Sequence, residues 1–265
     1  MQNALILCKA SFDENISGAG VYTAAALSKL GVSTAAAAEI DAENSGKIRD
    51  FFSKNGVDDS YIIESPDESF SFSVEEFDAV FITGEFVLES EKFCKLAAEI
   101  CGKCKKLEIP VVFDPGTNGL KEKQDALNEI AMLAEVFVPS IEDAEAIFGL
   151  NEPEKIADMY IKDGGSKIVI TLGKEGAFFK SRVENGRAPT FRADKVVDVT
   201  GAGDAFAAGL ISGIIEKLPL SEAVVRANAC GCCAIQSEGF RFPSMQELRE
   251  YMLTHRFVVE GCKDY

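Results

Sequence analysis

The sequence lacks several features that define other classes of protein. It has a single histidine, so a metal centre built from several histidines is excluded. It also has no tryptophan. No apolar run is long enough to cross a bilayer, and the first residues, from Met1 to Cys8, lack the basic region and cleavage site of a secretory signal. These absences predict a cytoplasmic protein with no membrane partner.

Basic residues are also scarce. The chain has 27 lysines and arginines against 43 aspartates and glutamates, which gives a formal net charge of -16. The acidic residues are scattered, so the surface would repel nucleic acid and anionic lipid, and we expect neither as a partner. Any anionic ligand therefore has to be bound by a local positive feature.

Cysteine is the exception to this scarcity, with eight residues. Cys101 and Cys104 have the CxxC spacing of a zinc or redox site, with Cys94 nearby. A structural zinc site usually needs a second pair, and the candidates for it, at 230, 232 and 233, lie in an alanine-rich stretch that is typical of a helix. The sequence favours buried free thiols in a reducing compartment over a metal site.

Short apolar runs alternate with helical stretches along most of the chain. Unbroken hydrophobic runs are typical of parallel strands that are covered on both faces. We expect strands at 4–8, 32–39, 79–83, 111–114, 136–139 and 167–172, and helices at 20–30, 45–55, 90–107, 121–134 and 141–148. This pattern predicts a single α/β domain over 1–265, with a doubly wound, mostly parallel sheet flanked by helices.

The C-terminal part has a different pattern. Helices are expected at 202–217, 221–237 and 244–255, and the last of them begins with a capping box, Ser244 followed by Glu247. Between 174 and 197, short alternating runs separated by glycine and proline predict hairpins. Open α/β sheets bind ligands at the carboxyl ends of their strands, so a site is expected in the loops that follow the strands.

The segment from 198 to 210, DVTGAGDAFAAGL, places three small residues directly before a carboxylate. Gly201, Ala202 and Gly203 open a helix, where backbone N–H groups lack an intrahelical partner and can bind phosphate. Asp204 would weaken phosphate binding by repulsion, but it is suited to accept a proton from a hydroxyl that attacks phosphorus. The alternative is an ordinary aspartate in the first turn of a helix.

Two other glycine motifs give weaker indications. The sequence contains no GxxxxGK[ST] pattern, which excludes a Walker A loop. Gly18-Ala19-Gly20 follows the first expected strand like a dinucleotide fingerprint, but Thr23 stands where the third glycine would be. A nicotinamide-dependent oxidoreductase is therefore a weaker alternative to phosphoryl transfer.

The segment 198–210 closely resembles the C-terminal signature of the ribokinase-like (PfkB) carbohydrate kinases. Further stretches agree: VPSIEDAE at 138–145, TLGKEG at 171–176 and ANA at 227–229 resemble motifs of the same family. The stretch 17–25, SGAGVYTAA, resembles the N-terminal Gly-Gly-x-x-x-Asn-x-Ala motif more loosely. The resemblance covers most of the chain and is strongest between 136 and 239. It implies a ribokinase-like fold and an ATP-dependent kinase.

The resemblance also implies roles for individual residues. Asp204 would be the catalytic base, and Gly201, Ala202 and Gly203 would form the anion hole for the γ-phosphoryl group. Asp143 would take the acidic position of the Mg²⁺ network. The monovalent cation that some relatives hold, potassium for instance, would lie near Asp198. The residues expected to line the nucleotide site are Thr171, Gly173, Gly176 and Asn228, and those expected to face the substrate are Asp13, Gly18, Thr23 and Glu85.

The chain departs from the family pattern mainly on the substrate side. Asp13 is the only candidate for the aspartate that grips sugar hydroxyls, and Thr23 replaces the sugar-binding asparagine. Ser140 replaces an asparagine beside the metal site, and the segment after Asp114 lacks the arginine that often follows. The β-lid would be reduced to 61–77, with room for short strands at 61–63 and 69–74. Such a lid would exclude water less well and would leave the site to a bulkier substrate or to closure by a second subunit in a homodimer.

These observations predict an ATP-dependent phosphotransferase that acts on a primary alcohol of a sugar or sugar conjugate of the fructose, fructosamine or ribose type. One alternative is a kinase of a non-sugar alcohol such as a vitamin precursor. Another is a degenerate homologue that binds a nucleotide or metabolite and regulates another protein. The retained Asp204 argues against the last alternative, because a binding protein would gain affinity by losing that carboxylate.

Overall fold

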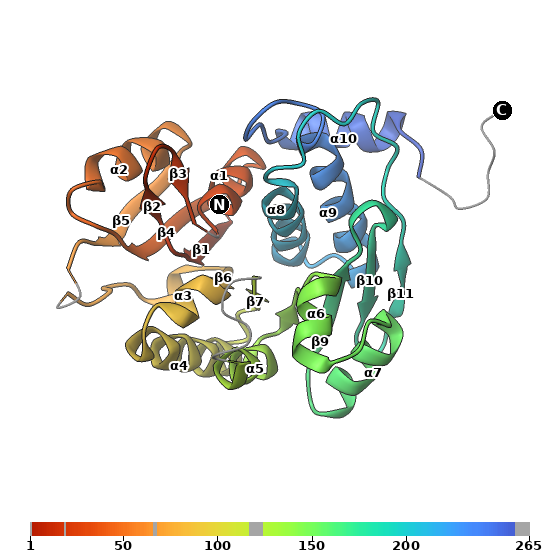
Figure 1. The fold of residues 1–265 in the computed structure, drawn as a ribbon, viewed down its shortest axis with the longest axis horizontal. Coiled ribbons are helices and arrows are strands. Elements are labelled where there is room, and N and C mark those ends of the chain that lie inside the picture. The colour runs from red at the N-terminus through yellow and green to blue at the C-terminus, as the bar shows by residue number, and fades with distance from the viewer. Residues whose placement is uncertain (1, 19, 66–67, 117–123, 258–265) are drawn as a thin grey trace.

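The protein is described by a computed structural model that covers residues 2–18, 20–65, 68–116 and 124–257. Its centre is a nine-stranded sheet in the order β11-β10-β9-β8-β7-β6-β1-β4-β5 (Figure 1). All neighbouring strands from β5 to β9 are parallel, whereas β10 and β11 form an antiparallel hairpin beside β9. The strands are β1 (Asn3–Leu7), β4 (Ser33–Glu39), β5 (Val57–Ile63), β6 (Ala79–Thr83), β7 (Val111–Asp114), β8 (Val136–Phe137), β9 (Lys167–Thr171), β10 (Ala177–Lys180) and β11 (Asn185–Ala188).

Helices cover both faces of this sheet and create two hydrophobic cores. Alternate residues of β1 point to opposite faces, so Ala4 and Ile6 belong to one core and Leu5 and Leu7 to the other. The first core includes α1 (Val21–Lys29), α2 (Ser45–Lys54), α8 (Ala202–Ile215), α9 (Leu220–Ala234) and α10 (Met245–Thr254). The second includes α3 (Gly84–Glu89), α4 (Glu91–Leu107), α5 (Gln124–Leu133), α6 (Ile141–Phe148) and α7 (Pro153–Lys162).

The doubly wound, mostly parallel α/β sheet predicted from the sequence is confirmed. The expected strands at 79–83 and 111–114 and the helix at 141–148 have the predicted bounds, and most other elements differ by one to three residues at an end. The first residues of the helix expected at 121–134 lie outside the described residues. The capping box at Ser244 and Glu247 is present, as is a second one at Ser140 and Asp143. The helices α3 and α7 are not among the predicted elements, although Pro153 at the start of α7 is a residue that favours the first position of a helix.

The lid strands expected within 61–77 are not formed. Residues 61–63 are instead the end of β5, which pairs with β4 at the edge of the main sheet. Of the described residues from 64 to 76, none lies in a strand. Phe70 in this stretch packs against Phe86 and Phe93, so the segment is attached to the α3–α4 core by aromatic contacts. The only second sheet found in the described residues is the small hairpin of β2 (Ser11–Phe12) and β3 (Ile16–Ser17).

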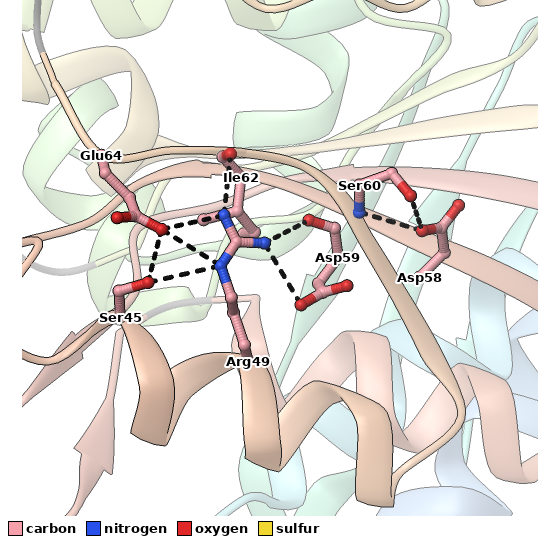
Figure 2. Close-up of polar contacts among 7 residues, drawn as sticks. All are labelled: Ser45, Arg49, Asp58, Asp59, Ser60, Ile62 and Glu64. Carbon is pink, nitrogen blue, oxygen red and sulfur yellow. Dashed lines mark hydrogen bonds and ion pairs between the residues drawn. The ribbon is translucent and has the colours of Figure 1, made fainter.

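A single arginine fastens the edge strand β5 to α2 (Figure 2). The pairing of β4 with β5 shifts register between Ala35 and Ala37, which leaves a bulge around Asp59. Arg49 donates to the backbone carbonyls of Asp59 at 3.0 Å and Ile62 at 3.3 Å, and to Oε1 of Glu64 at 3.1 Å. The guanidinium thus satisfies carbonyl groups that an edge strand would otherwise expose.

The CxxC cysteines predicted as buried thiols lie inside the second core. Cys101 and Cys104 are both on α4 and are 1% and 0% exposed. Burial raises the pKa of the Cys101 thiol to about 12 and that of the Cys104 thiol to about 11, which makes both poor nucleophiles at neutral pH. In the part of the chain that the structure describes, no helix is long and apolar enough to span a membrane.

Candidate functional site

The candidate site lies at the carboxyl edge of the parallel strands, where the strand order changes direction. The chain passes from β1 to β4 and β5 on one side and then returns to β6 on the other side of β1. Such a switch point leaves a crevice between diverging loops. The strands β1, β6, β7, β8 and β9 all end at this edge, and the N-terminal ends of α1 and α8 meet there (Figure 1).

The three residues predicted to form an anion site, Gly201, Ala202 and Gly203, lie at the start of α8. Gly201 is the N-cap with a φ of 78°, and a Cβ at this position would lie 2.9 Å from the ring of Phe240, so only glycine fits. The N–H of Ala202 is already bonded to the carbonyl of Val199 at 3.2 Å, which removes it from the expected set of donors. Gly203 is exposed, and nothing lies within 4 Å of where its Cβ would be. An anion can therefore approach the backbone most closely at Gly203.

Asp204 lies in the first turn of α8 and is half-buried. Its Oδ1 accepts two hydrogen bonds from Thr23, one from the hydroxyl at 2.8 Å and one from the backbone N–H at 3.1 Å. Burial raises the pKa of Asp204, the Thr23 hydrogen bonds lower it, and the charge of Glu85 raises it further. The carboxylate is thus a stronger base than an exposed aspartate.

Further carboxylates gather around Asp204 at the ends of β6, β7 and β8. Asp114 ends β7, and burial together with the charges of Asp143, Asp204 and Glu85 raises its pKa to about 7, although it accepts a hydrogen bond from the N–H of Gly116. Glu85 lies in the first turn of α3, directly after β6. Negative charge concentrated in this way favours binding of a cation.

The donor set fits a divalent cation of the kind that prefers oxygen ligands. Asp143 is 3% exposed, and its Oδ2 is held by the N–H and hydroxyl of Ser140, at 3.1 and 2.6 Å. Its Oδ1 is buried without a hydrogen-bond partner, which is costly unless a ligand satisfies it. Mg²⁺ commonly binds through one or two carboxylates plus phosphate oxygens. No group of three or more metal-ligating side chains occurs among the described residues.

The residues predicted for the nucleotide lie around the β9–β10 turn and α9. Thr171 ends β9, and Gly173 and Gly176 bound the turn that follows. A Cβ at Gly176 would lie 2.1 Å from the carbonyl oxygen of Ala188, and the side-chain amide of Asn228 donates to the same oxygen at 2.9 Å. The structure thus brings Gly176 and Asn228 to one point beside β11. Because the amide also donates to Pro189, Asn228 holds the end of β11 against α9.

The residues predicted for the substrate are more dispersed. Asp13 is exposed in the turn of the β2–β3 hairpin. Gly18 has a φ of 117° and packs against the carbonyl of Lys9, where a Cβ would be 2.1 Å away, so its role is to let the chain turn. Thr23 is 1% exposed and bound to Asp204. Asp198, predicted for a monovalent cation, accepts from the N–H groups of Thr200 at 2.9 Å and Gly239 at 3.3 Å.

Sequence reasoning missed some residues that shape the site. Asp114 was noted only as part of a departure from the family pattern, although its position at the end of a buried strand is where ligands of such sheets bind. Gly84 was not considered, yet a Cβ there would lie 1.7 Å from the carbonyl oxygen of Pro115, so β6 and β7 can bring their loops together only with glycine. Tyr22 stacks on Phe240, which in turn covers Gly201, and no local pattern indicates that contact.

The family comparison agrees with this geometry. The model of a family described as "pfkB family carbohydrate kinase" matches residues 68–247, which include α8, Asp143 and the residues predicted for the nucleotide. A 2-dehydro-3-deoxygluconokinase of Bacillus subtilis is 42% identical over 141 residues, which is 52% of this chain and 44% of that protein. The chain thus spans about half the length of the curated relatives it matches.

Solved structures with the same fold cover almost the whole chain. A protein from Escherichia coli described as ribokinase II, in complex with ATP and Mg²⁺, superposes with a TM-score of 0.80 over 96% of this chain and 100% of that chain, at 19% identity. A fructokinase from Vibrio cholerae O395, bound to fructose, ADP and calcium, has a TM-score of 0.76 over 95% of this chain and 99% of that chain, also at 19% identity. At this identity the likeness shows the ribokinase-like fold.

Proposed function

The chain belongs to the pfkB family of carbohydrate kinases, and from that membership and the site geometry we propose that it transfers the γ-phosphoryl group of ATP to a primary alcohol of a sugar or sugar conjugate. The observation that carries the proposal is the position of Asp204. A half-buried carboxylate with a raised pKa lies one residue after the open backbone of Gly203 at a helix N-terminus. A base and an anion site side by side are what phosphoryl transfer to an alcohol requires.

The chain's own residues then have defined tasks. Asp204 accepts the proton of the acceptor hydroxyl as the hydroxyl oxygen bonds to the γ-phosphorus and the bond from phosphorus to the β–γ bridging oxygen breaks, which releases ADP. The backbone N–H group at Gly203, with the positive end of the α8 dipole, stabilises the charge on the transferring oxygens.

Asp143 would hold Mg²⁺, with Glu85 and Asp114 close by, and when bound the ion would neutralise phosphate charge. The turn of Gly173 and Gly176, beside Thr171 and Asn228, would receive the nucleotide. This assignment rests on the glycine turn and on the resemblance of these stretches to the family motifs. The presence of potassium near Asp198, closure of the site by a second copy of the chain, and a cytoplasmic location stay predictions.

The test is ADP release from Mg-ATP, with potassium present, across a panel of acceptors. The panel contains sugars, 2-dehydro-3-deoxygluconate, fructosamines, nucleosides and vitamin alcohols. We expect substrate-dependent turnover, and we expect Asp204→Asn to reduce kcat by about 10²–10⁴-fold while ATP binding, measured by calorimetry, is retained. Equal turnover of the variant would refute the role of Asp204.

The second candidate is a regulatory homologue that binds a nucleotide or metabolite without turnover. It is favoured by the substrate side of the site, where Thr23 is buried and Asp13 is exposed at a hairpin turn. Silence across the whole panel with ATP binding intact would support this candidate against the kinase. A preference for a vitamin alcohol over every sugar would support the non-sugar kinase instead.

A further inference from the structure

The first turn of α1 is placed against the site by close backbone packing. Its N-cap, Gly20, has a φ of 90°, and a Cβ at this position would lie 2.8 Å from the Cβ of Cys8 and 2.9 Å from Cγ2 of Thr83. The helix therefore starts directly against the ends of β1 and β6, with no space for a side chain. This contact sets the direction in which the next turn of α1 points.

Thr23, in that turn, reaches across to α8. The distance along the chain between Thr23 and Asp204 is 181 residues, yet the threonine N–H and hydroxyl both donate to the same carboxylate oxygen, Oδ1. The N–H of a residue in the first turn of a helix has no intrahelical acceptor, so Asp204 acts as a cap for α1. Because both bonds go to Oδ1, the carboxylate is fixed in rotation and Oδ2 is left for another partner.

We propose that Thr23 is a positioning residue that orients Asp204, so that Oδ2 receives the proton of the acceptor hydroxyl. The proposal rests on the function proposed above, in which Asp204 is the base. It differs from the role that the family motif implies for this position, which is contact with the sugar. A side chain that is 1% exposed and has donated its only hydroxyl proton to Asp204 is poorly placed to bind a substrate.

The electrostatic surroundings make the Thr23 contact important for the ionisation of Asp204. Among the described residues, the titratable groups that interact with Asp204 include Glu85 from α3, Asp114 from β7, Tyr22 from α1 and Cys8 after β1. All four are acids. Burial and Glu85 raise the pKa of Asp204, and the two hydrogen bonds from Thr23 oppose that rise. Charge-assisted hydrogen bonds of this type contribute more than neutral ones.

The decisive variant is Thr23→Val, which has nearly the same shape and keeps the backbone N–H but loses the hydroxyl. The pKa of Asp204 should rise, since one hydrogen bond to an ionised group is lost. The acidic limb of the kcat/KM profile should move to higher pH, and kcat at neutral pH should fall about 10-fold, with little change in the KM for the acceptor. Thr23→Ser should restore the profile.

Thr34→Val is the matched control. Thr34 is also a buried threonine, 3% exposed, whose hydroxyl donates to a backbone carbonyl, that of Val32 at 3.0 Å, but it lies within β4. This variant loses a similar buried hydrogen bond, so it reports the cost of a structural change alone. Its pH profile should not move.

A measurement without catalysis separates this proposal from the proposed function. The carboxyl resonance of Asp204, labelled with ¹³C and assigned by its loss in Asp204→Asn, should titrate at higher pH in Thr23→Val than in the parent chain. If the Asp204 titration moves to higher pH in Thr23→Val but the parent chain phosphorylates no acceptor, the Thr23 contact is supported and the kinase function is rejected. An unchanged titration, or a large rise in KM with the acidic limb unmoved, would overturn the positioning role even if the chain is an active kinase.

Discussion

The two sides of the candidate site are built differently. On the α8 side its main features are glycines that expose the backbone, whereas on the α1 side they are contacts made by polar side chains. The absence of a side chain lets Phe240 approach the main chain at Gly201 and lets β11 approach it at Gly176, and it leaves the backbone open at Gly203. Around Thr23 and Arg49, polar side chains reach between separate elements, from α1 to α8 and from α2 to β5. The matched family model covers the first region and begins after the second, at residue 68.

This difference explains why the sequence predicted the backbone features of the first region but not the side-chain contacts of the second. A backbone site requires glycine at defined positions, so its motif can be recognised from the sequence alone. A contact such as that of Thr23 with Asp204 can be made by many pairs of residues, and nothing in the local sequence requires it. The variants below test whether the two regions contribute as differently as their construction suggests.

The largest effect should come from Gly203→Ala. The added methyl group would enter the open space above the helix start, where we expect the γ-phosphoryl group, so kcat/KM should fall about 10²-fold. The fold should be kept and even gain up to about 1 kcal/mol, because alanine favours a helix over glycine. Gly102→Ala is the matched control, since Gly102 is also helical with open space around it but lies on α4. Comparable losses in both variants would show that Gly203 is not close to the phosphate.

Next in size is the effect of Asp114→Asn on stability. Its folded pKa is raised to about 7 by burial and neighbouring carboxylates, so the native state holds the proton more tightly than the unfolded chain does. Stability is therefore highest below the unfolded pKa and is lost as the pH rises toward 7. Asparagine does not ionise, so it removes the loss of stability at higher pH. It also keeps an oxygen that can accept the hydrogen bond from the N–H of Gly116.

The variant should therefore be more stable than the parent by on the order of 1–3 kcal/mol at pH 8, and the difference should shrink toward zero near pH 4. Urea unfolding of the metal-free protein at both pH values measures this. A stabilisation of equal size at both pH values would show that repacking, rather than the charge on Asp114, is responsible.

The smallest effect should come from Arg49→Met, which tests the α1–α2 side as a structural element. The methionine fills part of the space but leaves the carbonyls of Asp59 and Ile62 without their donor, so unfolding should become easier by about 1–2 kcal/mol. Lys54→Met is the control, because its pair with Asp50 is far more exposed and should contribute less than about 0.5 kcal/mol. Turnover should be unchanged in both, and a collapse of activity in Arg49→Met would place β5 in the substrate site.

The Arg49 cluster should also respond to acid. The hydrogen bond from the Ser45 hydroxyl lowers the pKa of Glu64 most, and the hydrogen bond from Arg49 has the next largest effect. A lowered pKa adds stability above the unfolded value, and that contribution is lost as the pH falls through the folded pKa. The difference in urea midpoint between the parent and Arg49→Met should thus narrow below about pH 4. A constant gap down to pH 2 would contradict the ion pair with Glu64.

The sequence by itself was sufficient for the layered α/β sheet, the hairpin after β9, and the carboxylate behind a glycine-rich helix start. Each of these depends on hydrophobic periodicity or on backbone conformations that few residues allow, and both are local properties of the chain. The prediction of lid strands within 61–77 was wrong because strand pairing in this segment depends on tertiary contacts rather than on a local pattern. Whether 61–63 pairs with β4 or with a lid depends on Arg49 and on the aromatic packing of Phe70, which no local pattern records.

The tertiary structure alone decided which atoms face one another at the site. The hydrogen bonds from Thr23 to Asp204 join residues that are 181 positions apart, and the buried carboxylates of Asp114 and Asp143 acquire their character from neighbours on other strands. Burial and charge act through space, so the ionisation of a side chain cannot be read from its place in the chain.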